Sequence, residues 1–272
     1  MSDRPGWSAQ FASDALIELD AIPHLDDITP AWAWGGSTGK GVRVAVIDSG
    51  IDASHPGVGS APLRSVAIDE VDGQTEVGEV EHEDLFGHGT ACAGIIRSIA
   101  PECELTSIRV LGANLSGTGA MFIAGLRWAI EHGMDVCNLS LGSTKRRFYA
   151  EFHELADEAY FNNTLLVAAA NNMPTPSFPS TYASVVSVGS HDVDDPYTFY
   201  YNPTPPVEFG AFGIDVRVAW LDDGWIQATG NSFAAPHMTG VIARIREKHP
   251  ELTPFQVKTV LRALAANVRR KA

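Results

Sequence analysis

The sequence has few basic residues and few cysteines. Lys and Arg number 19 against 33 Asp and Glu, so the 272-residue chain has a formal net charge of -14. An acidic surface repels the phosphate backbone of nucleic acids, and we therefore expect no nucleic-acid partner. Three cysteines cannot all pair within one chain, so a disulfide scaffold is not expected and a reducing compartment is favoured.

Long apolar runs are also missing. No run approaches the roughly 18 residues that suggest a membrane-spanning helix, so we expect no membrane partner. The first thirty residues contain a single basic residue, Arg4, and no long apolar block, so no signal peptide is visible. We therefore predict a cytoplasmic location, with the cysteines as buried free thiols.

Short β-branched runs alternate with longer segments of helical period, which predicts an α/β domain with a mostly parallel sheet. No linker rich in Pro, Gly or Ser divides the chain, so we expect one domain. The predicted strands are 42–47, 105–111, 134–141, 165–170 and 185–189, and the predicted helices are 120–132, 145–162, 232–249 and 254–268.

The helix predicted at 232–249 has one clear apolar face, formed by Met238, Val241, Ile242 and Ile245. Proline lacks a backbone N–H and is tolerated in the first turn of a helix. Pro236 is therefore expected in the first turn, which places Ser232 at the helix N-terminus.

Three polar residues lie where a strand ends or a helix begins. Asp48 ends the apolar run Val-Arg-Val-Ala-Val-Ile, His88 opens His-Gly-Thr-Ala-Cys-Ala-Gly, and Ser232 begins the helix predicted at 232–249. In open α/β sheets reacting groups meet at such ends. A serine hydroxyl becomes a nucleophile when an imidazole takes its proton, and a carboxylate orients that imidazole. These three residue types therefore predict nucleophilic catalysis.

Three segments, 46–52, 88–94 and 230–237, resemble the active-site blocks of the subtilisin family of serine proteases. The resemblance extends from about Gly39 to the last helix. It implies a three-layer subtilisin-like fold over residues 39–272, with residues 1–38 as an N-terminal segment packing on that domain. It also implies a serine endopeptidase that forms an acyl-enzyme without a cofactor, using Ser232 as nucleophile, His88 as general base and Asp48 to orient His88.

The same resemblance implies where a peptide or protein substrate binds. The segment 167–172 is similar to the family block that ends in the oxyanion-hole asparagine, here Asn172. The segment 116–118 resembles the strand that pairs with the substrate backbone. The segment 140–142 resembles one wall of the pocket for the residue before the scissile bond. The substrate-binding residues are then Ser116, Gly117, Thr118, Ser140, Leu141 and Gly142.

The sequence departs from the family pattern in several places. Asn231 stands where threonine is common, and Asn171 where glycine is usual. The helix after His88 runs from Ile99 directly into Pro101 without the calcium-binding insertion of many secreted relatives, so we predict no metal site. About forty residues precede the first block, so no propeptide is expected, and the chain resembles an intracellular form or an excised catalytic domain.

Other functions remain open at this stage. The two asparagines leave a catalytically impaired peptide-binding or scaffold protein as the alternative. An esterase is a further one, because Gly35–Gly39 matches G-x-S-x-G with Ser37 as nucleophile, although no strand precedes it. Within the protease interpretation, general turnover competes with the maturation of a peptide precursor.

The stretch 70–84 is rich in acidic residues and directly precedes His88. Its simplest interpretation is a solvated surface loop. A sharper hypothesis is that its charge favours basic substrate residues near the cleft.

Overall fold

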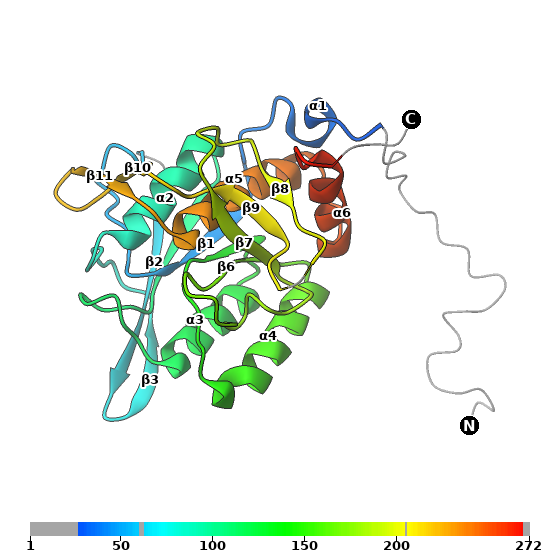
Figure 1. The fold of residues 1–272 in the computed structure, drawn as a ribbon. Helices are drawn as coiled ribbons and strands as arrows, with labels where there is room; N and C mark the ends of the chain where they lie inside the picture. Colours follow the sequence, from blue (N-terminus) through cyan, green and yellow to red (C-terminus); the bar gives the residue numbers. More distant parts are fainter. Residues whose placement is uncertain (1–26, 60–62, 205, 269–272) are drawn as a thin grey trace, which may run out of the picture.

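The computed structural model describes residues 27–59, 63–204 and 206–268 and shows three layers, with a sheet between two groups of helices (Figure 1). The nine sheet strands in these ranges run in the order β3-β2-β4-β1-β5-β6-β7-β9-β8. All pairs are parallel except β2 with β3 and β8 with β9. The strands are β1 Arg43–Asp48, β2 Leu63–Val71, β3 Gln74–Gly78, β4 Glu104–Arg109, β5 Val136–Leu139, β6 Leu165–Ala169, β7 Val186–His191, β8 Tyr200–Tyr201 and β9 Phe209–Phe212.

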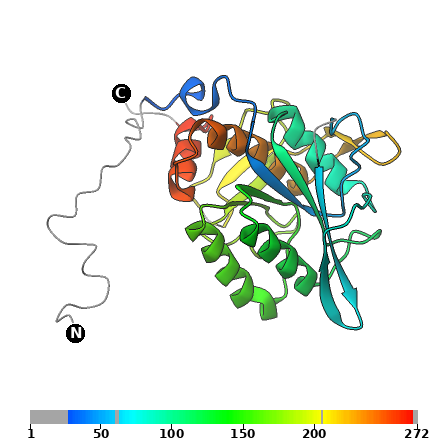
Figure 2. The same ribbon diagram turned by 180° about the vertical axis from the view of Figure 1, so that it is seen from behind.

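The helices cover both faces of this sheet, as the view from behind also shows (Figure 2). A separate antiparallel hairpin, β10 Val216–Ala219 with β11 Trp225–Ala228, lies beside α2. The helices are α1 Pro30–Trp34, α2 His88–Ile99, α3 Gly119–Glu131, α4 Tyr149–Phe161 after the 3-10 turn Arg146–Phe148, α5 Asn231–Lys248 and α6 Pro254–Leu264.

Alternate residues of each strand point to opposite faces of the sheet, and this builds two apolar cores. In β1, Val44 and Val46 face the core under α2, α5 and α6. Ala45 and Ile47 face the core under α3 and α4. The predicted α/β class and the three layers are confirmed.

Strand β1 lies at the point where the strand order reverses. Its neighbours are β4 on one side and β5 on the other. Strands β2 and β3 lie beyond β4, whereas β6 and β7 lie beyond β5. The carboxyl ends of the strands next to such a switch point form a crevice. Asp48, the last residue of β1, therefore lies at this crevice, where open α/β sheets bind their ligands.

The predicted strands and helices are present with shifted ends, but several elements were not predicted. The interpretation of 70–84 as a loop was wrong for β3, which pairs with β2 in a hairpin. Asp72 and Gly73 form its turn, both with positive φ (51° and 77°). An Asp-Gly pair is a strong hairpin signal because it tolerates this backbone. The other elements missed are α1, β2, β8, β9, β10 and β11.

The prediction that Pro236 lies in the first turn of its helix was wrong. Helix α5 begins at Asn231, which puts Pro236 in the second turn. A proline there leaves the carbonyl of Ser232 without its intrahelical partner. Two side chains replace the missing donor, since Ser140 Oγ lies 2.8 Å and Cys92 Sγ 3.6 Å from the Ser232 oxygen.

Residues 27–38 contact the C-terminal part of α5. Trp32 stacks on His249 with ring centroids 4.1 Å apart. Glu247 Oε2 accepts hydrogen bonds from the backbone N–H groups of Thr38, Gly39 and Lys40. Residues 1–26 of the predicted N-terminal segment lie outside the described residues, and the division at residue 38 remains a prediction.

Within the described ranges, none of the helices is both long and apolar enough to cross a lipid bilayer.

Candidate active site

Asp48 and His88 meet at the carboxyl end of β1. The Asp48 carboxylate is fully buried, and its two oxygens lie 2.8 and 2.9 Å from Nδ1 of His88. The N–H of Ser49 donates a further hydrogen bond to Asp48 Oδ1 at 2.8 Å. Nδ1 therefore bears the proton and Nε2 is left as the basic nitrogen, the arrangement that a general base requires.

The close approach of α2 to β1 depends on Gly89. A Cβ on this residue would lie 2.0 Å from the carbonyl oxygen of Gly50. Contacts that short do not occur, so any side chain at position 89 would push α2 away from the end of β1. Glycine at this position thus allows the first residue of α2, His88, to reach Asp48.

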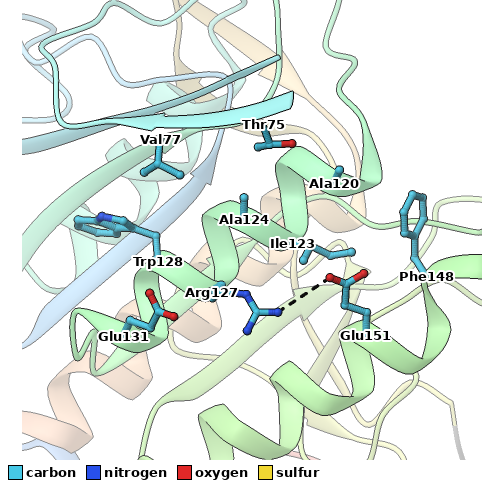
Figure 3. Close-up of a pocket in the computed structure, with 10 residues that line it drawn as sticks. All are labelled: Thr75, Val77, Ala120, Ile123, Ala124, Arg127, Trp128, Glu131, Phe148 and Glu151. Carbon is cyan, nitrogen blue, oxygen red and sulfur yellow. Dashed lines mark ion pairs between the residues drawn. The ribbon is translucent and has the colours of Figure 1, made fainter. Parts of the chain in front are cut away.

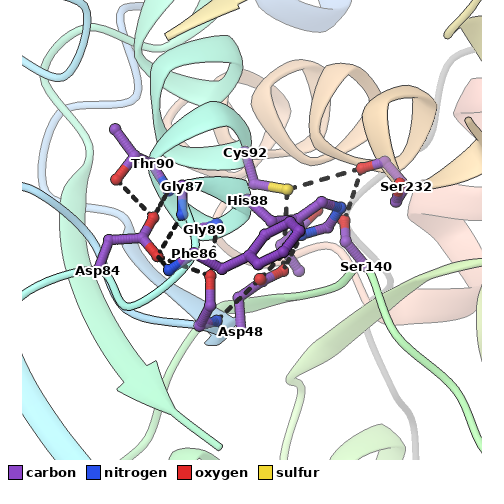
Figure 4. Close-up of polar contacts among 12 residues, drawn as sticks. Asp48, Asp84, Phe86, Gly87, His88, Gly89, Thr90, Cys92, Ser140 and Ser232 are labelled. Atoms are coloured by element: carbon purple, nitrogen blue, oxygen red, sulfur yellow. Dashed lines mark hydrogen bonds and ion pairs between the residues drawn. The ribbon is translucent and has the colours of Figure 1, made fainter. Parts of the chain in front are cut away.

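A second buried carboxylate, Asp84, holds the N-terminus of α2 (Figure 4). Its oxygens accept from the N–H groups of Phe86, Gly87 and Thr90 and from the hydroxyls of Ser49 and Thr90, at 2.6 to 2.9 Å. The Ser49 hydroxyl in turn accepts from the Gly89 N–H at 3.1 Å. Asp84 thereby satisfies donors that a helix start leaves free.

The sequence interpretation missed this role of Asp84. The N-cap position of α2 is Gly87, three residues after Asp84, so the usual capping signal in the sequence does not identify Asp84.

Two opposing effects act on the His88 imidazole. Burial disfavours the imidazolium, but the charge and hydrogen bond of Asp48, with a smaller contribution from Asp84, outweigh it and raise the pKa of His88 above its ordinary value. The imidazole is therefore a stronger base than a free histidine and can accept a proton from a nearby hydroxyl.

Ser232 lies beside this pair, in the first turn of α5. Its carbonyl contacts Cys92 Sγ, which is itself 3.9 Å from Asp48 Oδ2, and the ring of Phe233 lies 5.3 Å from that of His88. In the described part of the chain the Ser232 hydroxyl has no hydrogen bond, to His88 or to another group. Catalytic hydrogen bonds are often long without substrate and shorten in the substrate complex.

Asn172 lies next to the N-terminus of α5. Its Oδ1 accepts from the Asn231 N–H at 2.9 Å, which leaves the Nδ2 amide free to donate. A Cβ on Gly230 would lie 3.2 Å from Ser232 Oγ and 3.6 Å from Asn172 Nδ2. The hydroxyl and the amide thus face the same small space, which glycine at position 230 keeps open.

The two asparagines that depart from the family pattern fit this structure. The Asn231 amide accepts from the N–H and the hydroxyl of Ser190 and donates to the carbonyls of Ala170 and Asn171. It therefore ties α5 to the ends of β6 and β7. Asn171 has no positive φ, so its backbone does not require glycine.

The six predicted substrate-binding residues line one cleft together with His88. Ser140 has an additional contact, because its hydroxyl bonds the Ser232 carbonyl and accepts from Asn138 Nδ2 at 3.0 Å. This residue therefore also positions α5. Lys145 lines the same cleft and was not predicted.

A second groove lies away from this cleft, between β3 and α3 (Figure 3). Val77, Ile123 and Trp128 form its apolar lining, and Arg127 pairs with Glu151 across 3.9 Å at its rim. None of the predicted site residues lines it.

The described residues contain one cluster of three potential metal ligands: Asp48, His88 and Cys92. His88 Nδ1 is already bonded to Asp48, and burial together with the Asp48 charge raises the pKa of Cys92 well above its ordinary value. A metal would have to displace a proton from both groups, so this donor set fits proton transfer better than metal binding.

Ser37, the nucleophile of the esterase alternative, lies in a turn after α1. Its side chain is buried, and its hydroxyl donates to the Trp34 carbonyl at 2.7 Å. The described residues place no histidine against this hydroxyl, so Ser37 lacks the base that the esterase alternative requires.

Comparisons with known proteins agree with this geometry. Residues 39–271 match the Subtilase family. Subtilisin DY of Bacillus licheniformis is 32% identical over 251 residues, which cover 86% of each protein. M-protease of Shouchella clausii is also 32% identical, over 86% of this chain and 61% of that longer protein.

Among solved structures, a cold-adapted subtilisin-like serine proteinase superposes with a TM-score of 0.68 at 27% identity, covering 85% of this chain and 86% of the other. The predicted resemblance is confirmed: this chain belongs to the subtilase family of serine endopeptidases.

Proposed function

We propose that Ser232 attacks the carbonyl carbon of a peptide bond while Nε2 of His88 takes the hydroxyl proton. Asp48 keeps the other ring nitrogen protonated and stabilises the imidazolium that forms. The observation that supports this assignment most is the buried contact of His88 Nδ1 with both Asp48 oxygens, next to Ser232.

The reaction then proceeds in two halves. His88 returns the proton to the leaving amine as the C–N bond breaks, which leaves an ester between Ser232 and the acyl part of the substrate. A water molecule attacks this ester, again giving its proton to His88, and the carboxylic acid departs as the serine hydroxyl is restored.

Two donors are proposed for the oxyanion that forms in each half. They are Nδ2 of Asn172 and the backbone N–H of Ser232, which has no partner in the described part of the chain. A preorganised donor stabilises the negative oxygen more than the carbonyl from which it forms. The positive end of the α5 dipole adds to this effect.

Peptides are proposed to bind in extended form along Ser116–Thr118, with Ser140–Gly142 forming a pocket wall. Main-chain hydrogen bonds to an extended segment give affinity with little dependence on sequence. The impaired scaffold alternative is not favoured, since both unusual asparagines are accommodated. General turnover and precursor maturation both remain compatible with this site.

A peptide-library digest tests the assignment. The wild type is expected to cleave internal bonds and Ser232→Ala to cleave none, while a fluorophosphonate probe should label the wild type at Ser232 alone. Cleavage that survives in Ser232→Ala, or labelling at Ser37, would contradict it.

We also propose a cytoplasmic location and catalysis without a metal or cofactor. The three free, buried thiols of Cys92, Cys103 and Cys137 support the first. Cell fractionation tests the location. Activity that survives extensive dialysis against a chelator would support the second proposal, and activity restored only by added metal would contradict it.

A further inference from the structure

The cleft beside His88 has an uneven charge. Of the residues that line it in the described structure, Lys145 is the one lysine or arginine, and none is Asp or Glu. The described part of the cleft wall therefore has no carboxylate that could support the hypothesis that acidic residues near the cleft favour basic substrate residues.

Two carboxylates of the acidic stretch, Asp84 and Glu79, are engaged elsewhere. Asp84 is buried among five hydrogen-bond donors. Glu79 pairs with Arg64 at 2.8 Å, and Asp69 of the same hairpin pairs with Arg109 at 3.2 Å. These pairs reduce the charge that the hairpin presents to a substrate.

The segment bearing Lys145 is held on both sides of that residue. Ser143 forms two backbone hydrogen bonds with Phe178, at 2.8 and 2.9 Å, and its hydroxyl accepts from the Lys145 N–H at 3.2 Å. Three residues later, the ring of Phe148 packs so tightly on Gly119 that a Cβ there would lie 2.2 Å away. The position of the Lys145 backbone at the cleft is thereby defined.

The positive charge of this segment is not neutralised within the described structure. Lys145 and Arg146 are exposed and form no ion pair with a described residue, and the guanidinium of Arg147 lies over the Phe148 ring at 4.7 Å. Lys145 is thus the first of three consecutive basic residues, and it is the one that lines the cleft, in a protein whose net charge is -14.

We infer that Lys145 makes the cleft selective for an acidic side chain on the N-terminal side of the scissile bond. This inference rests on the proposed function, in which the substrate extends along Ser116–Thr118. Alternate side chains of an extended peptide point to the same side, so one of them faces Lys145 while its neighbours do not. A carboxylate there forms an ion pair that its neutral amide cannot form.

The expected preference is modest because the lysine is exposed. An exposed ion pair of this kind changes a binding constant or a cleavage rate by roughly two- to fivefold. The preference should also decline as salt is added, since salt screens exposed charges.

Paired peptides that differ only by Glu or Gln at one position test the inference. We expect the wild type to cleave the Glu peptide faster, by the factor above, at one position before the scissile bond. Lys145→Gln should remove this preference, and Lys145→Glu should favour Lys over Gln at the same position. Lys40→Gln is the matched control, because it removes an exposed charge outside the cleft.

Equal cleavage of Glu and Gln peptides by the wild type, or a preference that persists in Lys145→Gln, would overturn the inference. Binding of the same fluorescent peptides to Ser232→Ala gives a readout that needs no cleavage. Failure of the wild type to cleave any peptide contradicts the proposed function, whereas the ratio of Glu to Gln binding, with and without Lys145→Gln, still decides the inference.

Discussion

Helices α2 and α5 both begin at the active site, yet side chains satisfy the N–H groups at their N-termini to different extents. The start of α2 is closed by Asp84, which accepts five hydrogen bonds in a buried position. At the start of α5, Asn172 Oδ1 accepts from the N–H of Asn231 alone, and the Ser232 N–H lacks a partner in the described structure.

This difference matches what each helix has to do. The proposed base must keep one orientation, and the hydrogen bonds that Asp84 and Ser49 accept from Gly87, Gly89 and Thr90 hold this helix start in place beside Asp48. The proposed nucleophile must act beside donors that are free when negative charge develops, and the unpartnered Ser232 N–H at the start of α5 is such a donor in the described structure.

The buried histidines of the two helices differ in the same way. The pKa of His88 is raised, because Asp48 outweighs the effect of burial. His237 of α5 is also buried, but no carboxylate of the described residues is bonded to it, and burial outweighs the Asp194 charge and lowers its pKa to about 4. The histidine with a carboxylate partner is the one suited to proton transfer.

The largest expected effect comes from removing that carboxylate. Asp48→Asn should lower kcat by about 10,000-fold, the size seen for this change in another serine protease triad, because the imidazole loses its orientation and its counter-charge. The acid limb of activity should also move to lower pH. Activity disappears as pH falls through the pKa of His88, and burial alone lowers that pKa.

Profiles of kcat/KM against pH for both enzymes measure this shift. An acid limb at the same pH in Asp48→Asn and the wild type would mean that Asp48 does not set the pKa of His88.

The second largest effect is expected on stability, when the Asp84 carboxylate at the N-terminus of α2 is removed. Asp84→Ala leaves several buried donors unsatisfied, and we expect the free energy of unfolding to fall by about 4 kcal/mol. Urea unfolding in a Ser232→Ala background, which avoids self-digestion, measures it. Asp84→Asn keeps part of the cap and should lose less; equal stability of the two variants would argue against capping as the cause.

At the open end of α5, loss of the Asn172 amide should reduce kcat with little change in KM. Removal of one oxyanion donor from a subtilisin lowers turnover by about 100- to 1,000-fold, and we expect the same range for Asn172→Ala. Asn171→Ala is the control, since that side chain bonds the Met173 N–H and not the proposed oxyanion space. Comparable losses in both variants would indicate a disturbed loop instead.

The smallest effect concerns His237. The ordinary pKa of histidine is 6.5, and that of His237 in the folded protein is about 4. As pH falls through this window, the unfolded chain binds a proton at His237 that the folded protein does not. The free energy of unfolding therefore decreases by on the order of 3 kcal/mol. Unfolding of Ser232→Ala with and without His237→Asn, compared at pH 7 and pH 4, isolates this contribution. A difference between the two proteins that does not change with pH would contradict it.

Much of the fold followed from local patterns. The alternation of β-branched runs with helical segments predicted the parallel sheet and its covering helices. The β2–β3 hairpin escaped because its acidic residues were interpreted as a loop, although Asp72-Gly73 specified the turn. Pro236 was misplaced because the sequence does not show that Ser140 and Cys92 supply donors to the Ser232 carbonyl.

The identities of Asp48, His88 and Ser232, each at the end of a recognisable local element, were readable from the chain itself. Local periodicity and short motifs depend only on residues that are adjacent in sequence, so they can be recognised without the structure. The closed cap of Asp84, the free amide of Asn172 and the position of Lys145 in the cleft depend on segments distant along the chain. Only the packing of the sheet and helices brings those segments within a few ångströms, so only the tertiary structure decided them.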